Sequence, residues 1–326
     1  MKESDVARIL HSRGVAVVFA LLLAGAARFA FDYTAISYIP SDRGFVLPSP
    51  NLWISNGDIS FWVNVSLTIF AAFGMLLLSR TFNLLRTVSQ LDSSLFLVMS
   101  LSAPDLLCQF FSGTLLVIVL LCCLFLLYST YASPQATPRI FLLFFILSGA
   151  AMTQYCYAVY IPVFVIGVGQ MRIFSLRTVS AMLAGIVTPW WIAIGGGLVD
   201  MSEIHLPELT SFFAMPDTGG VVNIMLAVVL TAILLLGGWS LNFMKMLSYN
   251  AHLRAYTGTL SVMSIFTLLA IVADFNNVYA YLPVLYMLCS FQLCQTFVNR
   301  DRSHSAGAIV LILILYLGLY ALAVLV

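Results

Sequence analysis

Charged residues are scarce in this sequence. Asp, Glu, Lys and Arg make up 8% of its 326 residues, against about 25% in soluble domains. A chain with 62% hydrophobic residues cannot cover its surface in water, so the composition excludes a soluble protein and predicts a polytopic membrane protein. The net formal charge of +1 and the lack of a basic patch argue against a nucleic-acid partner.

Several motifs are also missing. No Gly-x-Gly-x-x-Gly follows a strand, and the sequence has neither a Walker loop nor His-Glu-x-x-His, which argues against a nucleotide-driven cytoplasmic enzyme. The six cysteines lie within apolar stretches and form no metal-type Cys-x-x-Cys pair. We therefore interpret them as small buried hydrophobic residues.

Long apolar runs are what the sequence does contain. They predict an all-α bundle in which residues 1–326 form a single integral membrane domain with about eleven transmembrane spans. The predicted spans are 15–31, 59–79, 91–103, 112–130, 140–152, 158–169, 179–199, 221–243, 257–273, 278–297 and 306–326. Boundaries are least defined for the third, fifth and sixth spans. The third is short, so it either begins nearer Thr87 or is partly re-entrant, and nothing charged separates the other two.

The first apolar run has two interpretations. Its basic start and the segment Ala24-Gly-Ala-Ala27 are typical of a cleaved signal peptide. We expect an uncleaved span instead, because Phe29-Ala-Phe31 lengthens the run and many more spans follow.

The charges predict the orientation of the bundle. With the N-terminus inside, the inner loops collect every Lys and Arg except Arg28 and Arg43, and the outer side collects most of the acidic residues. This distribution follows the positive-inside rule. We therefore predict an N-in, C-out protein of the bacterial inner membrane, with its two longest loops, residues 32–58 and 200–219, outside.

Candidate functional residues lie at the outer ends of the spans. Arg28 ends the first span, where a guanidinium can bind a lipid-linked phosphate; the alternative is that it reaches the interface or pairs with Asp32 one turn later. Asp32, Asp105 and Asp274 end the first, third and ninth spans, and they predict an acidic cluster opposite Arg28 if those ends meet. For Asp105, which follows Pro104, a helix N-cap is the alternative.

Three further residues complete the candidate set. Arg43 and Asp58 lie in or beside the first outer loop, and His205 lies in the second. The imidazole of His205 titrates near neutral pH, and the outer carboxylates offer oxygen ligands to a divalent cation. For each loop acid, and for His205, the alternative is an ordinary solvated side chain.

The residues also carry a resemblance to a family. Arg28-Phe-Ala-Phe-Asp32 closes the first span, Ser102-Ala-Pro-Asp105 precedes an apolar run, and Ser148-Gly-Ala-Ala151 is followed by Tyr155 to Pro162, Arg172 and Arg177. In these features the first 200 residues or so resemble GT-C-type glycosyltransferases and the related O-antigen polymerases and ligases. The chain is equally similar to bacterial inner-membrane proteins for which the resemblance implies no activity.

The resemblance implies transfer or polymerisation of polyprenyl-linked sugars at the outer face. Asp32 would be the base, helped by Asp105 or Asp274, and Arg28 and Arg43 would bind the lipid phosphate. The chain departs from the family in having no Asp-Glu pair after Asp32.

Two other functions stay open, a transporter or lipid flippase and a non-catalytic assembly subunit. Coupled carriers usually have ionisable residues or broken helices deep in the membrane. The sequence offers Thr188-Pro189 and Gly195 to Gly197 as one break, without a matching break in a second half.

Overall fold

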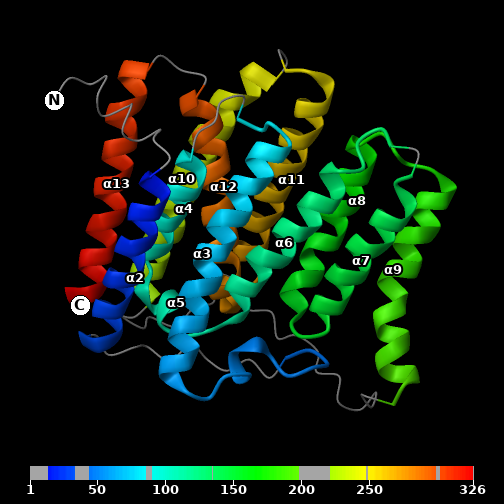
Figure 1. Cartoon of the computed structure of the whole chain (residues 1–326), viewed down its shortest axis with the longest axis horizontal. Coiled ribbons are helices and arrows are strands. Elements are labelled where there is room, and N and C mark those ends of the chain that lie inside the picture. Colours follow the sequence, from blue (N-terminus) through cyan, green and yellow to red (C-terminus); the bar gives the residue numbers. More distant parts are fainter. Residues whose placement is uncertain are drawn as a thin grey trace.

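The computed structural model describes residues 14–33, 44–85, 90–133, 135–197, 221–246, 249–298 and 302–325. In this part of the chain all regular structure is helical, and twelve α-helices pack side by side (Figure 1). The prediction of an all-α bundle is confirmed, and one hydrophobic core extends from α2 to α13.

Seven helical segments of the described chain are long and apolar enough to cross a membrane. A helix rises about 1.5 Å per residue, so about 20 residues cross the hydrocarbon layer. The helices that contain these segments are α2 (Val15–Tyr33), α3 (Gly57–Thr81), α9 (Leu176–Gly195), α10 (Val221–Met246), α11 (Ala251–Ala273), α12 (Val278–Val298) and α13 (Arg302–Leu325). The chain is therefore a multi-pass integral membrane protein.

The other predicted spans are also helical, but they are shorter and interrupted. These elements are α4 (Leu91–Leu101), α5 (Pro104–Cys108), α6 (Ser112–Tyr128), α7 (Thr137–Ala151), the 3₁₀ segment η2 (Tyr155–Tyr160) and α8 (Ile161–Gln170). Two further 3₁₀ turns are η1 (Pro50–Leu52) and η5 (Phe275–Asn277). Each of the eleven predicted spans thus coincides with helix. Whether all of them cross the membrane, and in which direction, stays a prediction.

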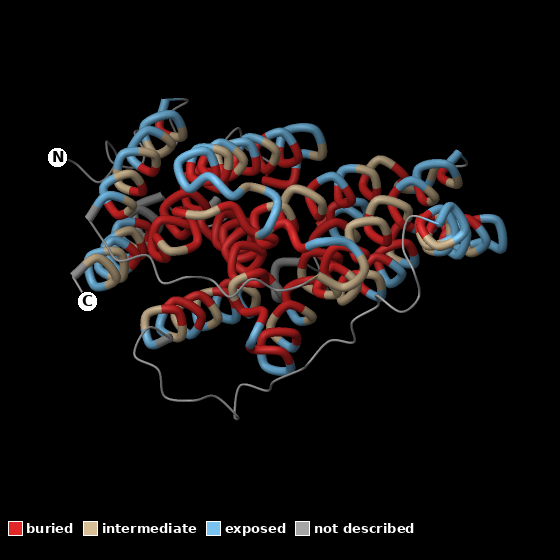
Figure 2. Tube along the Cα trace, turned by 90° about the horizontal axis from the view of Figure 1, so that it is seen from below, coloured by how far each residue is buried: buried red, intermediate tan, exposed pale blue. Residues whose placement is uncertain are grey.

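Burial separates central from peripheral helices. Every residue of α4 is buried, and α12 packs against α4, α6, α10 and α11. Buried residues gather in the middle of the bundle, and exposed ones at its periphery (Figure 2). Peripheral helices keep an apolar face exposed instead: on α9, Leu176, Leu183 and Trp191 are 89%, 60% and 75% exposed. Because apolar faces of this size are not stable in water, they contact the lipid bilayer.

Contacts between distant residues define the two ends of the bundle. The Arg28 end is where α2 ends and α3 begins, and a salt bridge from Arg28 to Asp58 joins these two helices. The start of α6 lies at the same end, because the Phe110 amide just before it donates to the Ser60 hydroxyl in the first turn of α3 at 2.7 Å. The Tyr157 hydroxyl of η2 donates to the Ser112 carbonyl there at 2.9 Å. The end of α11 is joined to η2 there by the hydrogen bond from Tyr155 to Asp274.

The opposite end, where α3 ends, is here called the Arg80 end. Phe82, Tyr128 and Tyr256 form a cluster of aromatic rings there, which joins the ends of α3 and α6 to the start of α11. The turn after α6 is joined to the end of α8 by a hydrogen bond from the Ala132 amide to the Met171 carbonyl.

Part of the predicted loop 32–58 is folded onto the Arg28 end. The amides of Val46 and Leu47 both donate to the Met152 carbonyl at 2.9 Å, and the Asn51 side chain accepts from the Ser112 amide at the start of α6. Gly44 begins this segment with φ +82, a conformation that glycine adopts without strain. Residues 44–53 therefore cover the junction between α7 and η2.

The short helices α4 and α5 replace the predicted third span. Between them and α6 the backbone leaves the helix, and side chains of α3 satisfy its polar groups. The Asn64 amide donates to the carbonyls of Leu106 and Leu107 at 2.7 and 3.2 Å, and the Ser60 hydroxyl accepts from the Phe110 amide. Non-helical backbone is stable at membrane depth only when protein groups satisfy it in this way.

Candidate functional site

Arg28 is held by two carboxylates. Its guanidinium lies 3.0 Å from Asp32, one helical turn later on α2, and 3.0 Å from Asp58 in the first turn of α3. It also lies 5.0 Å from the centroid of the Phe31 ring and 5.6 Å from that of Phe61. The interpretation in which Arg28 pairs with Asp32 agrees with this geometry. The two carboxylates already neutralise the positive charge of Arg28, which a bound phosphate would otherwise use.

The two carboxylates of this group are exposed. The side chains of Asp32 and Asp58 are 43% and 69% exposed, so water screens their interaction with Arg28. Asp58 follows the Asn56 side chain that caps α3, and an acid in a first helical turn is favourable to the helix dipole. Both acids thus have a structural explanation in addition to the predicted catalytic and binding roles.

Asp274 has a different environment. It is the C-terminal cap of α11 and only 3% exposed. One oxygen of its carboxylate accepts hydrogen bonds from the Tyr155 hydroxyl at 2.8 Å and from the Asn277 amide at 2.9 Å. Gln154 in turn donates to the Asn277 side-chain oxygen at 3.0 Å. We call Gln154, Tyr155, Asp274, Asn277 and Tyr281 the Asp274 cluster.

Tyr281 adds an unusual feature to this cluster. Its hydroxyl is buried and has no hydrogen-bond partner among the described residues, although it lies within electrostatic range of Asp274 and Tyr155. Buried hydroxyls are nearly always hydrogen-bonded, and exceptions often mark a place for water or an ion. The cluster therefore combines a buried carboxylate with a hydroxyl that can donate to, or accept from, a small polar species.

Asp105 lies half-buried in the first turn of α5. It acts electrostatically on Cys108 and on Tyr279 of α12. Ala103 occupies the N-cap position of α5, so Asp105 does not have the capping position that was its alternative interpretation.

The structure thus places the predicted residues in separate groups. Arg28, Asp32 and Asp58 meet directly, whereas Asp274 is bound by Tyr155 and Asn277. Arg43 and His205 lie outside the described residues. Within the part that is described, no group of three His, Cys, Asp or Glu side chains has the arrangement that a metal ion needs.

Sequence reasoning missed the partners of Asp274 and the burial of a second acid. The contact of Asn277 with Asp274 could have been predicted from the sequence. The two residues are three positions apart in Asp274-Phe-Asn-Asn277, a spacing at which side-chain contacts are common. Tyr155 is too far away in sequence to be found. Asp92 lies at the start of the predicted third span, and the sequence does not reveal that it is 0% exposed or that the Ser79 hydroxyl donates to it at 2.5 Å.

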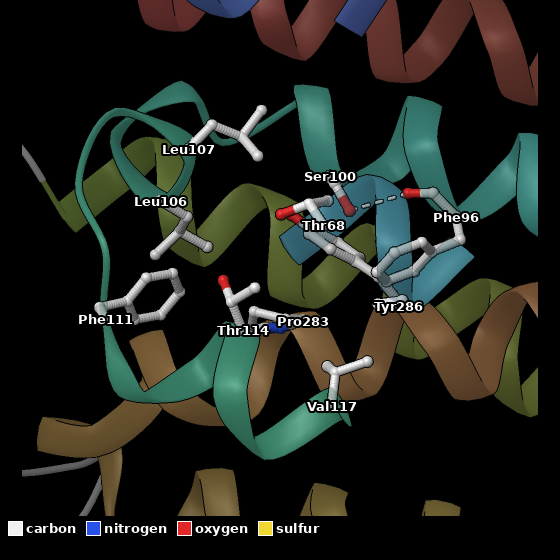
Figure 3. A pocket seen from close by; sticks show the side chains of 11 residues that line it. Thr68, Phe96, Ser100, Leu106, Leu107, Phe111, Thr114, Val117, Pro283 and Tyr286 are labelled. Atoms are coloured by element: carbon white, nitrogen blue, oxygen red, sulfur yellow. Dashed lines mark hydrogen bonds between the residues drawn. The ribbon is translucent and has the colours of Figure 1, made fainter. Parts of the chain in front are cut away.

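A small cavity lies in the core beside the break between α5 and α6 (Figure 3). Its volume of about 20 Å³ is enough for about one water molecule. The lining is mostly apolar, with hydroxyl groups from Thr68, Ser100, Thr114 and Tyr286. Pro283 of α12 also lines it, and a proline inside a helix removes one backbone hydrogen bond.

Comparison with protein-family models, with curated protein sequences and with solved structures gives no match, and the function is therefore inferred from the residues alone.

Proposed function

We propose that the protein is a membrane transporter that binds and releases a proton at Asp274 during its cycle. The observation that carries this proposal is the environment of that carboxylate. It is 3% exposed, and one of its oxygens accepts hydrogen bonds from Tyr155 of η2 and from Asn277 of η5.

Burial makes a charge on Asp274 costly. An ionised carboxylate away from water is unstable unless it is paired or strongly hydrogen-bonded, and binding a proton removes the charge. Ionisable residues at membrane depth are candidates for proton or ion pathways for this reason. A protonation step at Asp274 also changes its hydrogen bonds, since a neutral carboxyl group becomes a donor.

Interrupted helices surround the same cluster. Tyr155 lies on η2, which precedes α8, and Asn277 ends η5, which precedes α12. Transporters often place their coupling sites where helices are discontinuous. The contact between Tyr155 and Asp274 therefore joins two such breaks, and a change in the protonation of Asp274 acts on both.

Sugar transfer at the outer face is the second candidate. Its support is that Asp32 and Asp58 are exposed beside the aromatic rings of Phe31 and Phe61, within the predicted outer surface. It ranks second because Arg28 is already bridged by two carboxylates, so a phosphate would have to displace one of them. Loss of glycan product in membranes that carry Asp32→Asn would favour this candidate, and unchanged product would remove Asp32 from the mechanism.

The transport proposal is tested with purified protein in liposomes that contain the pH-sensitive dye pyranine. Gradients of amino acids, sugars, nucleosides and inorganic cations are imposed one class at a time, and the internal pH is followed. We expect one class to move protons. Asp274→Asn should reduce that movement to the level of protein-free liposomes, because the amide cannot bind a proton at these pH values.

Asp58→Asn is the matched control, since it removes an exposed carboxylate at the same end of the bundle. It should leave proton movement unchanged. Proton movement by Asp274→Asn at the wild-type rate would refute the proposal. Infrared spectra supply a readout that needs no substrate: if every pH-dependent carboxyl band of the wild type is also present unchanged in Asp274→Asn, proton binding at Asp274 is refuted.

A further inference from the structure

A second buried carboxylate lies at the other end of the bundle. Asp92 occupies the first turn of α4, the helix whose residues are all buried, and is itself 0% exposed. Helix α4 packs against α2, α3, α12 and α13, so Asp92 lies inside the protein. A buried acid away from the Asp274 cluster needs its own explanation.

The contacts of Asp92 are to neutral groups. One carboxylate oxygen accepts from the Ser93 amide at 2.9 Å, and the other accepts from the Ser79 hydroxyl on α3 at 2.5 Å. These two donors offset part of the cost of a buried charge. The hydrogen bond to Ser79 can run in either direction, because a hydroxyl group donates and accepts.

Oxygen acceptors are abundant at the start of α4. The hydroxyls of Ser93 and Ser94 both donate to the Gln90 carbonyl at 2.9 Å. The side-chain oxygen of Gln90 is buried and has no partner among the described residues. A proton on Asp92 would add a donor to a region in which acceptors predominate.

Among the described residues, Arg80 is a charged group that acts electrostatically on Asp92. It is exposed and directly follows Ser79, the residue that binds Asp92, near the end of α3. The Asp274 cluster belongs to the opposite, Arg28 end, where α11 finishes. The cavity of Figure 3 lies between the two, since its Ser100 is about 12 Å further along α4 than Asp92 at about 1.5 Å per residue.

We propose that Asp92 is a second proton-binding site, which exchanges protons with the Arg80 end of the bundle as Asp274 does with the Arg28 end. In the ionised state the Ser79 hydroxyl donates to the carboxylate. When a proton binds, the neutral carboxyl group donates to the Ser79 oxygen, and the Ser79 hydroxyl turns to a backbone carbonyl of α3. Only the role of Asp92 in transport rests on the proposed function; its binding of a proton does not.

Infrared difference spectroscopy of the purified full-length protein tests this proposal. Spectra are recorded between acidic and alkaline buffer, in the region where protonated carboxylic acids absorb. We expect two buried carboxyl bands in the wild type. Asp92→Asn should remove one of them, and Asp274→Asn should remove the other.

Ser79→Ala is the second variant, and it keeps the test valid if Asp92→Asn does not fold. Loss of the Ser79 hydrogen bond should shift the frequency of the Asp92 band and leave the Asp274 band unchanged. A spectrum in which neither Asp92→Asn nor Ser79→Ala alters any pH-dependent band overturns the proposal. Loss of the Asp274 band alone would support the proposed function while refuting this inference, so the two failures are distinguishable.

Discussion

Among single residues, Asn64 shows how a polar side chain stabilises the core of this membrane protein. It is 0% exposed, and its amide donates to two carbonyls at the end of α5. A five-residue helix cannot satisfy these carbonyls itself, since its last carbonyls lack helical partners.

Asn64→Ala should therefore destabilise the protein by about 1–3 kcal/mol, which is the usual effect of leaving buried polar groups without a partner. The measurement is thermal unfolding in detergent. Ser66→Ala is the control, because Ser66 is exposed on the same helix and its replacement should not change the melting temperature. Equal melting temperatures of the two variants would show that the hydrogen bonds from Asn64 to the Leu106 and Leu107 carbonyls do not stabilise the protein.

At this scale the sequence predicts only local relations. The sequence offers the pairing of Arg28 with Asp32 as an alternative to phosphate binding, because the two residues are one helical turn apart. The partners of Asp274 and Asp92 were not, because Tyr155 and Ser79 are brought to them by the packing of other helices. The burial of Asp92, at the end of the predicted span 91–103, depends likewise on helix packing, which hydropathy does not describe.

At the scale of helices, the apolar runs predict where the helices lie but not where they are interrupted. The third span ends at Leu101, and the chain continues as α5 because Asn64 and Ser60 of α3 satisfy the interrupted backbone. Those residues are far from the break in sequence, so a local pattern cannot reveal it. The proline at position 104 indicated an end of the helix, and the structure agrees with that.

The close packing of α7 on α9 gives a prediction for a helix pair. A Cβ atom on Gly185 would lie 2.7 Å from the Phe141 carbonyl oxygen and 2.9 Å from the Phe144 Cβ. Small residues allow helices to approach in this way within a membrane. At the same contact the Ser148 hydroxyl donates to the Ile186 carbonyl at 2.7 Å.

Gly185→Ala should lower the melting temperature, since overpacking costs about 1–3 kcal/mol and the gain in helix propensity is about 1 kcal/mol. Gly237→Ala is the matched control: it lies within α10 with nothing within 4 Å of the new Cβ, and it should be neutral or stabilising. If the two variants have the same melting temperature, α7 and α9 can move apart to accommodate the new methyl group without loss of stability, and their contact is not tight.

At the scale of the whole molecule, the described charges other than Arg28 and the buried Asp92 are sorted between the two ends. Arg80, Arg139 and Arg172 lie at the Arg80 end, where Arg139 donates to the Ser129 carbonyl after α6. The Arg28 end holds Asp58 and Asp274. This sorting fits the positive-inside rule with the Arg80 end in the cytoplasm, but helix packing alone does not orient a bundle in a membrane.

Cysteine labelling of intact cells tests the orientation. Leu52 is 51% exposed in the segment that covers the Arg28 end, and Gln135 is exposed in the turn between α6 and α7 at the Arg80 end. A membrane-impermeant maleimide should label Leu52→Cys in intact cells, and Gln135→Cys only after the inner membrane is permeabilised. The unsubstituted protein is the control for its own cysteines, most of which are buried. The reverse pattern would invert the bundle, and Asp92 rather than Asp274 would then exchange protons with the outside.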